Sequence, residues 1–300
     1  MLEHMFPFSY IALLIGFFIG IGITAACIGF FSATVIIICI CIGVIQIMPF
    51  FKFFHNILCY LLPKQVNHIE ENLKATYTVS GNTSLEMSQY IFMWHPHSVF
   101  VSSMFFHTST KLTEWPLQLR NIKCVASNLV MWFPFMNEIF NEFDIIPSDY
   151  HIMKKTLEDG KSFSVSAGGM REMLYENTSL LSKRRGIFKM ALETGTPLVP
   201  VISVDDNRLW KMVDIPAWIQ DALNPYDICL PVPTLKSVYK WLGILRNPLK
   251  DPIRSIIGTP ILVEKVVSPS ESDIAELRRK YIDALQKMYK TETGNELIVQ

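Results

Sequence analysis

Residues 90–106, YIFMWHPHSVFVSSMFF, contain the feature that decides the fold. Five apolar residues, 90–94, run directly into His95, and Pro96 separates this histidine from His97. Proline fixes its own backbone angle and lacks an amide proton, so neither a strand nor a helix continues smoothly across it. The long apolar side chains that follow Ser98 suit a helix. We therefore predict a buried strand, a sharp turn that carries both histidines, and then an apolar helix.

Further strands and helices are predicted to alternate from residue 89 to about residue 203. This alternation is typical of an α/β domain with a central, mainly parallel sheet, whose sites lie where strands end and helices begin. The segment before residue 89, from 63 on, is interpreted as a polar entry segment. The expected strands are 122–126, 162–166, 197–202 and 254–257. The expected helices are 149–159 with Ser148 as N-cap, 187–194 stopped by Gly195, and a C-terminal helix that Ser270 and Asp273 cap. The apolar stripe expected on this last helix is Ile274, Leu277, Tyr281, Leu285 and Met288.

A long uncharged run lies near the N-terminus. Residues 8–51 contain no charged side chain, whereas one transmembrane helix needs about 20 apolar residues. Two legs fit, at about 8–28 and 31–51, so we predict a membrane hairpin within residues 1–62 and a domain over 63–300. A single long tilted span is the alternative. Lys52 and Lys64 follow the second leg, which favours a cytosolic location for the larger domain.

Composition excludes several other classes of protein. Lys plus Arg and Asp plus Glu number 27 each, so no excess of positive charge indicates a nucleic-acid partner. The six cysteines are scattered and form no C-x-x-C pair, so neither a disulfide scaffold nor a cysteine-based zinc site is expected. Asn82 and Asn177 begin glycosylation sequons that a cytosolic domain would leave unused.

The two histidines of the turn admit more than one interpretation. A lone histidine in an apolar segment is most often a packed, hydrogen-bonded core residue, but two that flank a proline are harder to explain by packing. General acid–base chemistry is one role. Zinc binding by His95, His97 and His107 is another, although no cluster of Cys, Asp or Glu stands near, and we predict no metal.

Two further segments are candidates for a site. The predicted strand 162–166 ends in Gly168 and Gly169, followed by Arg171 and Glu172. Glycines at a strand end let backbone approach a ligand closely, although an ordinary strand-to-loop turn would look the same. The second segment is 183–186, KRRG, which is either a solvated face or a receptor for the phosphates of coenzyme A.

Four blocks of the sequence resemble the type 2 diacylglycerol acyltransferase family, which includes monoacylglycerol and wax-alcohol acyltransferases. The resemblance covers about residues 6–290, and Ser98 stands where that family usually has glycine. The four blocks are YIFMWHPHS (90–98), SVSAGGMRE (164–172), RRGIFKMALETGTPLVPV (184–201) and the C-terminal run that begins IIGTPILVEK (256–265).

The resemblance implies a glycerolipid-acyltransferase-like α/β domain that transfers a fatty acyl group from acyl-CoA to a lipid hydroxyl, with diacylglycerol as the first expected acceptor. Monoacylglycerol and wax alcohol are the alternatives. The resemblance also implies acyl-CoA as co-substrate and no cofactor. The implied partners are membrane lipids and a neutral-lipid acceptor, and a homo-oligomer is a further possibility. The implied location is the endoplasmic reticulum membrane, with the catalytic domain facing the cytosol, and lipid droplets as a further location.

The matched blocks also suggest roles for individual residues. An imidazole that removes the proton of the attacking hydroxyl fits the chemistry, and His95 is preferred over His97 because it stands at the strand end. Either the other histidine or Glu172 is expected to orient the base. The expected substrate-binding residues are Pro96, Ser98, Gly168, Gly169, Arg171, Arg184, Arg185 and Gly186. A catalytically inactive lipid-droplet module and a zinc hydrolase remain as alternatives.

Overall fold

The computed structural model describes part of the chain, and the predicted hairpin lies outside that part. None of the helices within the described residues is long and apolar enough to cross a membrane. Ser98, Arg171 and His107 also lie outside. The described residues are 76–80, 85, 89–97, 101, 103–104, 122–128, 144–169, 172, 178–182, 184–204, 211–216, 218–219, 234, 237 and 254–300.

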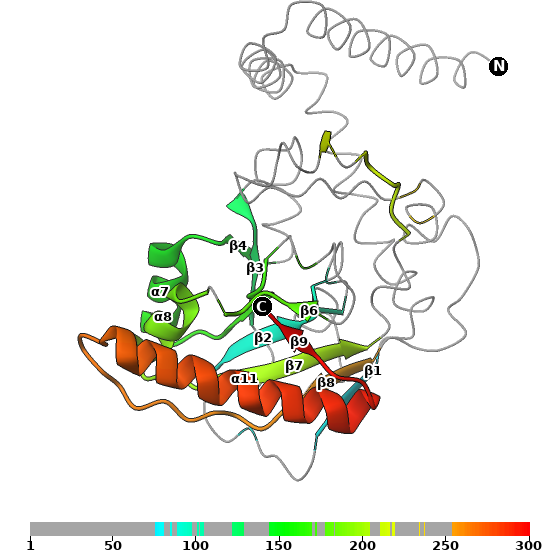
Figure 1. Cartoon of the computed structure of the whole chain (residues 1–300). Helices are drawn as coiled ribbons and strands as arrows, with labels where there is room; N and C mark the ends of the chain where they lie inside the picture. The colour runs from blue at the N-terminus through cyan, green and yellow to red at the C-terminus, as the bar shows by residue number, and fades with distance from the viewer. Residues whose placement is uncertain are drawn as a thin grey trace, which may run out of the picture. The chain divides into compact units, whose positions relative to one another are not determined.

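Seven strands form the central sheet in the order β1-β8-β7-β2-β5-β3-β4 (Figure 1). Every neighbouring pair is parallel except β7 and β8, so β1 and β8 run against the other five strands. The prediction of an α/β domain with a mainly parallel sheet is therefore confirmed. The strands are β1 Thr76–Val79, β2 Ile91–His95, β3 Lys123–Ala126, β4 Ile145–Pro147, β5 Phe163–Val165, β7 Leu198–Val204 and β8 Arg254–Ile257.

Strand β2 lies in the middle of the sheet, between β7 and β5, and both of its faces are buried. Ile91 and Met93 belong to one apolar core, whereas Phe92 and Trp94 belong to the other. This is why the strand reads as an unbroken apolar run rather than an alternating one. By the same alternation, His95 shares a face with Ile91 and Met93.

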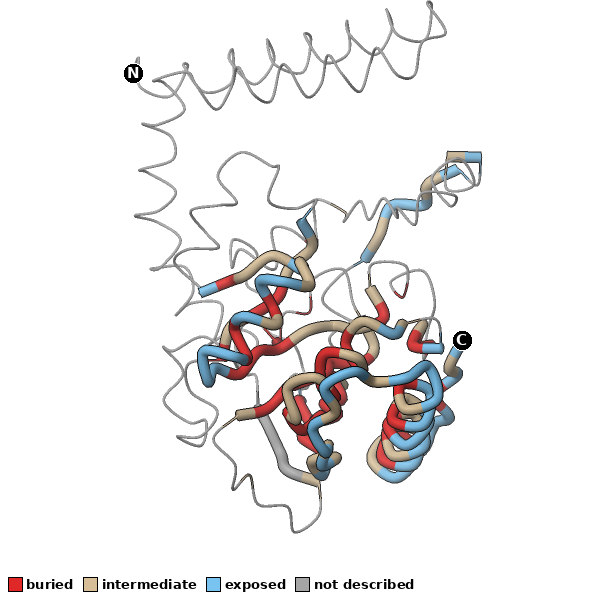
Figure 2. The backbone as a smooth tube through the Cα atoms, turned by 90° about the vertical axis from the view of Figure 1, so that its left-hand side faces the viewer, coloured by how far each residue is buried: buried red, intermediate tan, exposed pale blue. Residues whose placement is uncertain are grey.

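Three helices of the described part of the chain contribute to the core on that face. They are α7 Tyr150–Glu158, α8 Gly186–Thr194 and α11 Glu271–Thr293. Helix α11 packs on β7 and on α8 (Figure 1). Its predicted apolar stripe is confirmed, since Ile274, Leu277, Tyr281, Leu285 and Met288 are all buried. Figure 2 shows the result, a helix buried along one side and exposed along the other.

Two helix starts test the predicted caps. The capping box of α11 is confirmed, because the Ser270 hydroxyl accepts from the Asp273 amide while the Asp273 carboxylate accepts from the Ser270 amide. The Ser148 cap is wrong. Asp149 caps α7 instead and accepts from the His151 and Ile152 amides, whereas the Ser148 amide donates to the Ala126 carbonyl. The predicted stop at Gly195 is confirmed, with φ +71°.

Four strands were not predicted. β1 lies in the segment interpreted as polar entry, and β4 is only three residues long. The other two, β6 Thr178–Ser179 and β9 Ile298–Val299, pair in parallel as a separate two-stranded sheet. Two-residue strands carry too little periodicity for a sequence pattern to show. This small sheet nevertheless bears directly on the site.

Candidate active site

The two histidines of the turn lie in different environments. His95 is the last residue of β2 and is fully buried, with 0% of its surface exposed. The chain turns at Pro96, the His95–Pro96 peptide bond is cis, and His97 is only half-buried. Of the two residues, His97 is the more exposed, whereas His95 is enclosed by its neighbours. This burial weighs against the preference for His95 that its place at the strand end suggested.

Both ring nitrogens of His95 have hydrogen-bond partners. Nδ1 lies 3.1 Å from the Ser179 hydroxyl, and Nε2 lies 3.1 Å from the Tyr281 hydroxyl. Burial, reinforced by the nearby charge of His97, lowers the pKa of His95 to about 3. The ring is therefore neutral at pH 7, with one nitrogen that donates and one that accepts.

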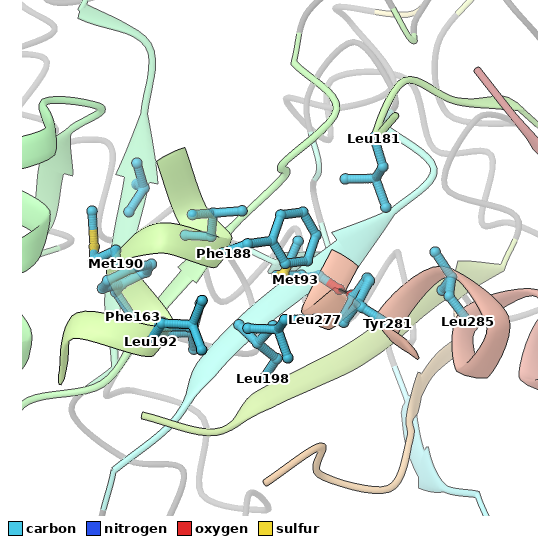
Figure 3. Packing of buried hydrophobic residues seen from close by; sticks show 14 of the residues in the cluster. Met93, Phe163, Leu181, Phe188, Met190, Leu192, Leu198, Leu277, Tyr281 and Leu285 are labelled. Atoms are coloured by element: carbon cyan, nitrogen blue, oxygen red, sulfur yellow. Dashed lines mark hydrogen bonds between the residues drawn. The ribbon is translucent and has the colours of Figure 1, made fainter. Parts of the chain in front are cut away.

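Tyr281 reaches this point from the buried face of α11. Its ring packs edge-on against the ring of Phe188, with 5.7 Å between the centroids (Figure 3). Its hydroxyl also lies 3.4 Å from the Met93 carbonyl. Burial raises the pKa of Tyr281 well above its ordinary value, so the phenol keeps its proton and can donate it.

Glu172 is the second fully buried group, again with 0% of its surface exposed. One carboxylate oxygen accepts from the Ser179 hydroxyl at 2.7 Å and from the Leu180 amide at 2.6 Å. The other accepts from the His97 amide at 3.0 Å. Burial raises the pKa of Glu172, while these hydrogen bonds and the charge of Arg184 lower it. The carboxylate thus ties the backbone of the histidine turn to the β6 segment.

The glycine pair after β5 makes room for this carboxylate. A Cβ atom on Gly168 would lie 1.5 Å from a Glu172 oxygen, so no larger residue fits beside that side chain. Gly169 has φ +80°, and a Cβ there would lie 2.6 Å from an Arg184 nitrogen. The same nitrogen of Arg184 donates to the Gly168 carbonyl at 2.8 Å. The space left by the glycines is filled by Glu172 and Arg184 of the chain itself.

The remaining predicted substrate-binding residues lie at the start of α8. The exposed side chain of Arg185 makes an ion pair with Glu271 of α11. Gly186 is the first residue of α8, where a Cβ would lie 3.9 Å from the Tyr150 ring, an ordinary contact. Among the described residues, no group of three or more His, Cys, Asp or Glu side chains is suited to hold a metal ion.

Two residues of the site were not identified from the sequence. Tyr281 was recognised only as part of an apolar stripe, because its hydroxyl gives no signal in a periodicity pattern. Ser179 was noted only as the last residue of a glycosylation sequon. What brings both to His95 is tertiary structure: α11 crosses the sheet above β2, and β6 approaches from outside the main sheet. Both residues are far from His95 in the sequence, so no local motif could have predicted either contact.

The sequence is similar to that of known acyltransferases. The family model described as "Diacylglycerol acyltransferase" matches residues 69–296. Mouse 2-acylglycerol O-acyltransferase 1 is 29% identical over 223 residues, which cover 68% of this chain and 65% of that protein. Diacylglycerol O-acyltransferase 2 from Xenopus tropicalis is 29% identical over 239 residues, 72% of this chain and 65% of that one. The matched part of the chain spans just under two thirds of these relatives.

A solved structure is also similar, the 1-acyl-sn-glycerophosphate (LPA) acyltransferase PlsC from Thermotoga maritima. The TM-score is 0.45 and the identity 14%, over 85% of this chain and 93% of that chain. A likeness of this size carries no argument about the site. The family model, in contrast, covers most of the chain, including the histidine turn, Glu172 and α11. The chain belongs to the diacylglycerol acyltransferase family.

Proposed function

We propose that the protein is a membrane-bound O-acyltransferase that moves a fatty acyl group from acyl-CoA to the free hydroxyl of diacylglycerol, giving triacylglycerol. The observation that carries the proposal is the turn at the end of β2. It presents one half-buried histidine, His97, whose backbone amide is held by a fully buried carboxylate, that of Glu172. A histidine whose backbone is held in place and whose side chain is not fully enclosed suits general base catalysis.

His97 is the proposed base. Its neutral imidazole takes the proton of the acceptor hydroxyl as the hydroxyl oxygen attacks the thioester carbonyl carbon. The tetrahedral intermediate then expels the coenzyme A thiolate, which receives that proton from the imidazolium. The products are an ester and the free thiol of coenzyme A, and no proton or electron is left over. A positioned base of this kind contributes about 10²- to 10⁴-fold to the rate.

Arg185 is proposed to meet the phosphates of acyl-CoA. Its guanidinium is exposed and is paired only at the surface, with Glu271. A surface ion pair of this kind is worth at most about 1 kcal/mol, so a phosphate can displace the carboxylate at little cost. Arg184 acts differently, since one of its guanidinium nitrogens donates to the Gly168 carbonyl beneath Glu172.

One observation favours a second candidate for the acceptor. The mouse relative is named for 2-acylglycerol and the frog relative for diacylglycerol, and both are 29% identical to this chain. Monoacylglycerol is therefore the competing acceptor, and wax alcohol the third.

The proposed location is the endoplasmic reticulum membrane, with lipid droplets as a further location. Residues 8–51 would anchor the protein in the membrane, and the larger domain would face the cytosol. The sequons at Asn82 and Asn177 would then stay unmodified.

Microsomes from cells that express the full chain, supplied with labelled oleoyl-CoA and each acceptor in turn, test the proposal. We expect labelled triacylglycerol from diacylglycerol, and a loss of at least about 100-fold in His97→Ala. His151→Ala is the matched control, because His151 is exposed on α7. The proposal is wrong if well-expressed wild-type protein transfers no label to any acceptor, and the base is wrong if His97→Ala is as active as His151→Ala.

A further inference from the structure

The Ser179 hydroxyl stands between the two buried groups of the site. It lies 2.7 Å from a Glu172 oxygen and 3.1 Å from Nδ1 of His95, and Ser179 itself is 0% exposed. The next residue donates its amide to the same Glu172 oxygen. A single two-residue strand, β6, therefore supplies the bridge to His95 and supports the carboxylate that holds the His97 amide.

The direction of each hydrogen bond in this chain follows from the chemistry of its ends. An ionised carboxylate can only accept, so the Ser179 hydroxyl donates to Glu172. Its oxygen then accepts from Nδ1–H of His95, which leaves Nε2 of the neutral ring as an acceptor. The Tyr281 phenol lies 3.1 Å from that nitrogen and 3.4 Å from the Met93 carbonyl, and it can donate its one proton to either acceptor. The Ser179 hydroxyl can thus accept from His95 and donate to Glu172 at the same time, whereas the methyl group of an alanine at this position can do neither.

The backbone of Ser179 is held from the opposite side by the C-terminal residues. β9 pairs with β6, the Gln300 amide donates to the Ser179 carbonyl at 2.9 Å, and the Ser182 amide donates to the Gln300 carbonyl at 3.0 Å. Leu297, just before β9, is buried at 3% exposure and anchors this strand in the core. Ser179 is therefore fixed at its backbone and at its hydroxyl.

We propose that Ser179 is a positioning residue for acyl transfer, whose hydroxyl joins the Glu172 carboxylate to the His95 imidazole and so fixes the turn that carries His97. This inference rests on the proposed function, because its effect is on the base of that reaction. Removing the hydroxyl leaves Nδ1 of His95 without its acceptor and takes one of three donors from Glu172. The carboxylate then holds the turn less firmly, and the imidazole of His97 is less often in position.

Three variants in the acyltransferase assay test the proposal. Ser179→Ala removes the hydroxyl, and Ser179→Thr restores a hydroxyl at the same carbon. Ser255→Ala is the matched control, because Ser255 is a fully buried serine of β8 whose hydroxyl has no hydrogen-bond partner in the described part of the chain. We expect Ser179→Ala to lose about tenfold or more in kcat, as for a lost hydrogen bond to a charged group, with KM for acyl-CoA within about twofold.

The pH profile separates positioning from simple damage to the fold. The acid limb of kcat/KM reports protonation of the base and, through the turn that carries the base, protonation of Glu172. Because the Ser179 hydrogen bond lowers the pKa of Glu172, this limb should move to higher pH in Ser179→Ala and back in Ser179→Thr. Equal activity and equal acid limbs in Ser179→Ala and Ser255→Ala would overturn the positioning role while the proposed function stands. Absence of transfer by the wild-type protein would instead overturn the proposed function.

Discussion

The burial of His95 makes the stability of the protein depend on pH in a way that can be calculated. In the unfolded chain this histidine binds a proton near its ordinary pKa of 6.5, whereas in the folded protein its pKa is about 3. The pKa is lowered on folding, so the stability that His95 contributes is fully present above pH 6.5 and is lost as the pH falls towards 3. Within that window the free energy of unfolding falls by about 1.36 kcal/mol for each unit by which the pH falls, or by roughly 5 kcal/mol over the whole window.

Between pH 7 and pH 5 the expected loss from His95 alone is about 2 kcal/mol. For a domain of this size that lowers Tm by about 4 °C or more. The groups that face His95 are His97 on the turn, Tyr281 on α11 and, through Ser179, Glu172. Burial raises the pKa of Glu172, which acts in the opposite direction, so wild-type protein must be compared with a variant rather than assessed alone.

Thermal unfolding of detergent-purified protein, followed by tryptophan fluorescence at pH 7, 6 and 5, measures the effect. His95→Gln and His95→Asn each keep an amide for one of the two hydrogen bonds of the ring but cannot titrate, and His151→Gln is the exposed control. The fall in Tm from pH 7 to pH 5 should be smaller in either His95 variant than in wild-type protein, and unchanged in His151→Gln. If all four proteins lose Tm equally, His95 does not enter the fold as a buried neutral ring.

Three other perturbations have expected outcomes. Gly168→Ala should abolish acyl transfer, because the new methyl group displaces the Glu172 carboxylate, whereas Gly160→Asn, at a turn with φ +76° and open space, should leave activity intact. Ser164→Ala should raise the free energy of unfolding in denaturant by up to about 1 kcal/mol, because it removes a buried hydroxyl with no hydrogen-bond partner among the described residues. Arg185→Gln should raise KM for acyl-CoA and change Tm little, since its ion pair is exposed.

Periodicity and composition predicted most of the main sheet. The run before His95, the alternation after residue 89 and the stripe of the C-terminal helix are long patterns in which each position reports on burial, and all three were confirmed. Strands β6 and β9 were missed because two residues carry no period, and β1 was missed because it lies in a segment that was interpreted as polar entry. The Ser148 cap was wrong because two adjacent residues, Ser148 and Asp149, are both good caps, and only the path of β4 decides between them.

The candidate site was predictable in part for a similar reason. His95, His97, Gly168 and Glu172 stand out in the sequence because a proline or a glycine next to a polar residue interrupts an apolar strand. The structure brings these four together, directly or through Ser179. The roles of the two histidines, however, depend on which ring the fold encloses. Strand position alone favoured His95, and only the crossing of α11 above β2 shows that this ring is enclosed.

A fully buried carboxylate beside a fully buried imidazole is a poor way to stabilise a core. Desolvation of such groups costs several kcal/mol, and well-packed apolar side chains of similar volume usually serve stability as well or better. Hydrogen bonds, unlike apolar contacts, fix both the direction and the distance between the groups that they join. The Glu172 carboxylate accepts from the His97 amide, Leu180 and Ser179, and so joins the turn to β6 at a defined distance. A base that must meet a hydroxyl and a thioester at once needs that fixed distance, because small misplacements of a catalytic group cost large factors in rate. If His97 is the base, as we propose, the cost in stability is a requirement of the turn, and the buried His95 contributes to catalysis only by holding that turn in place.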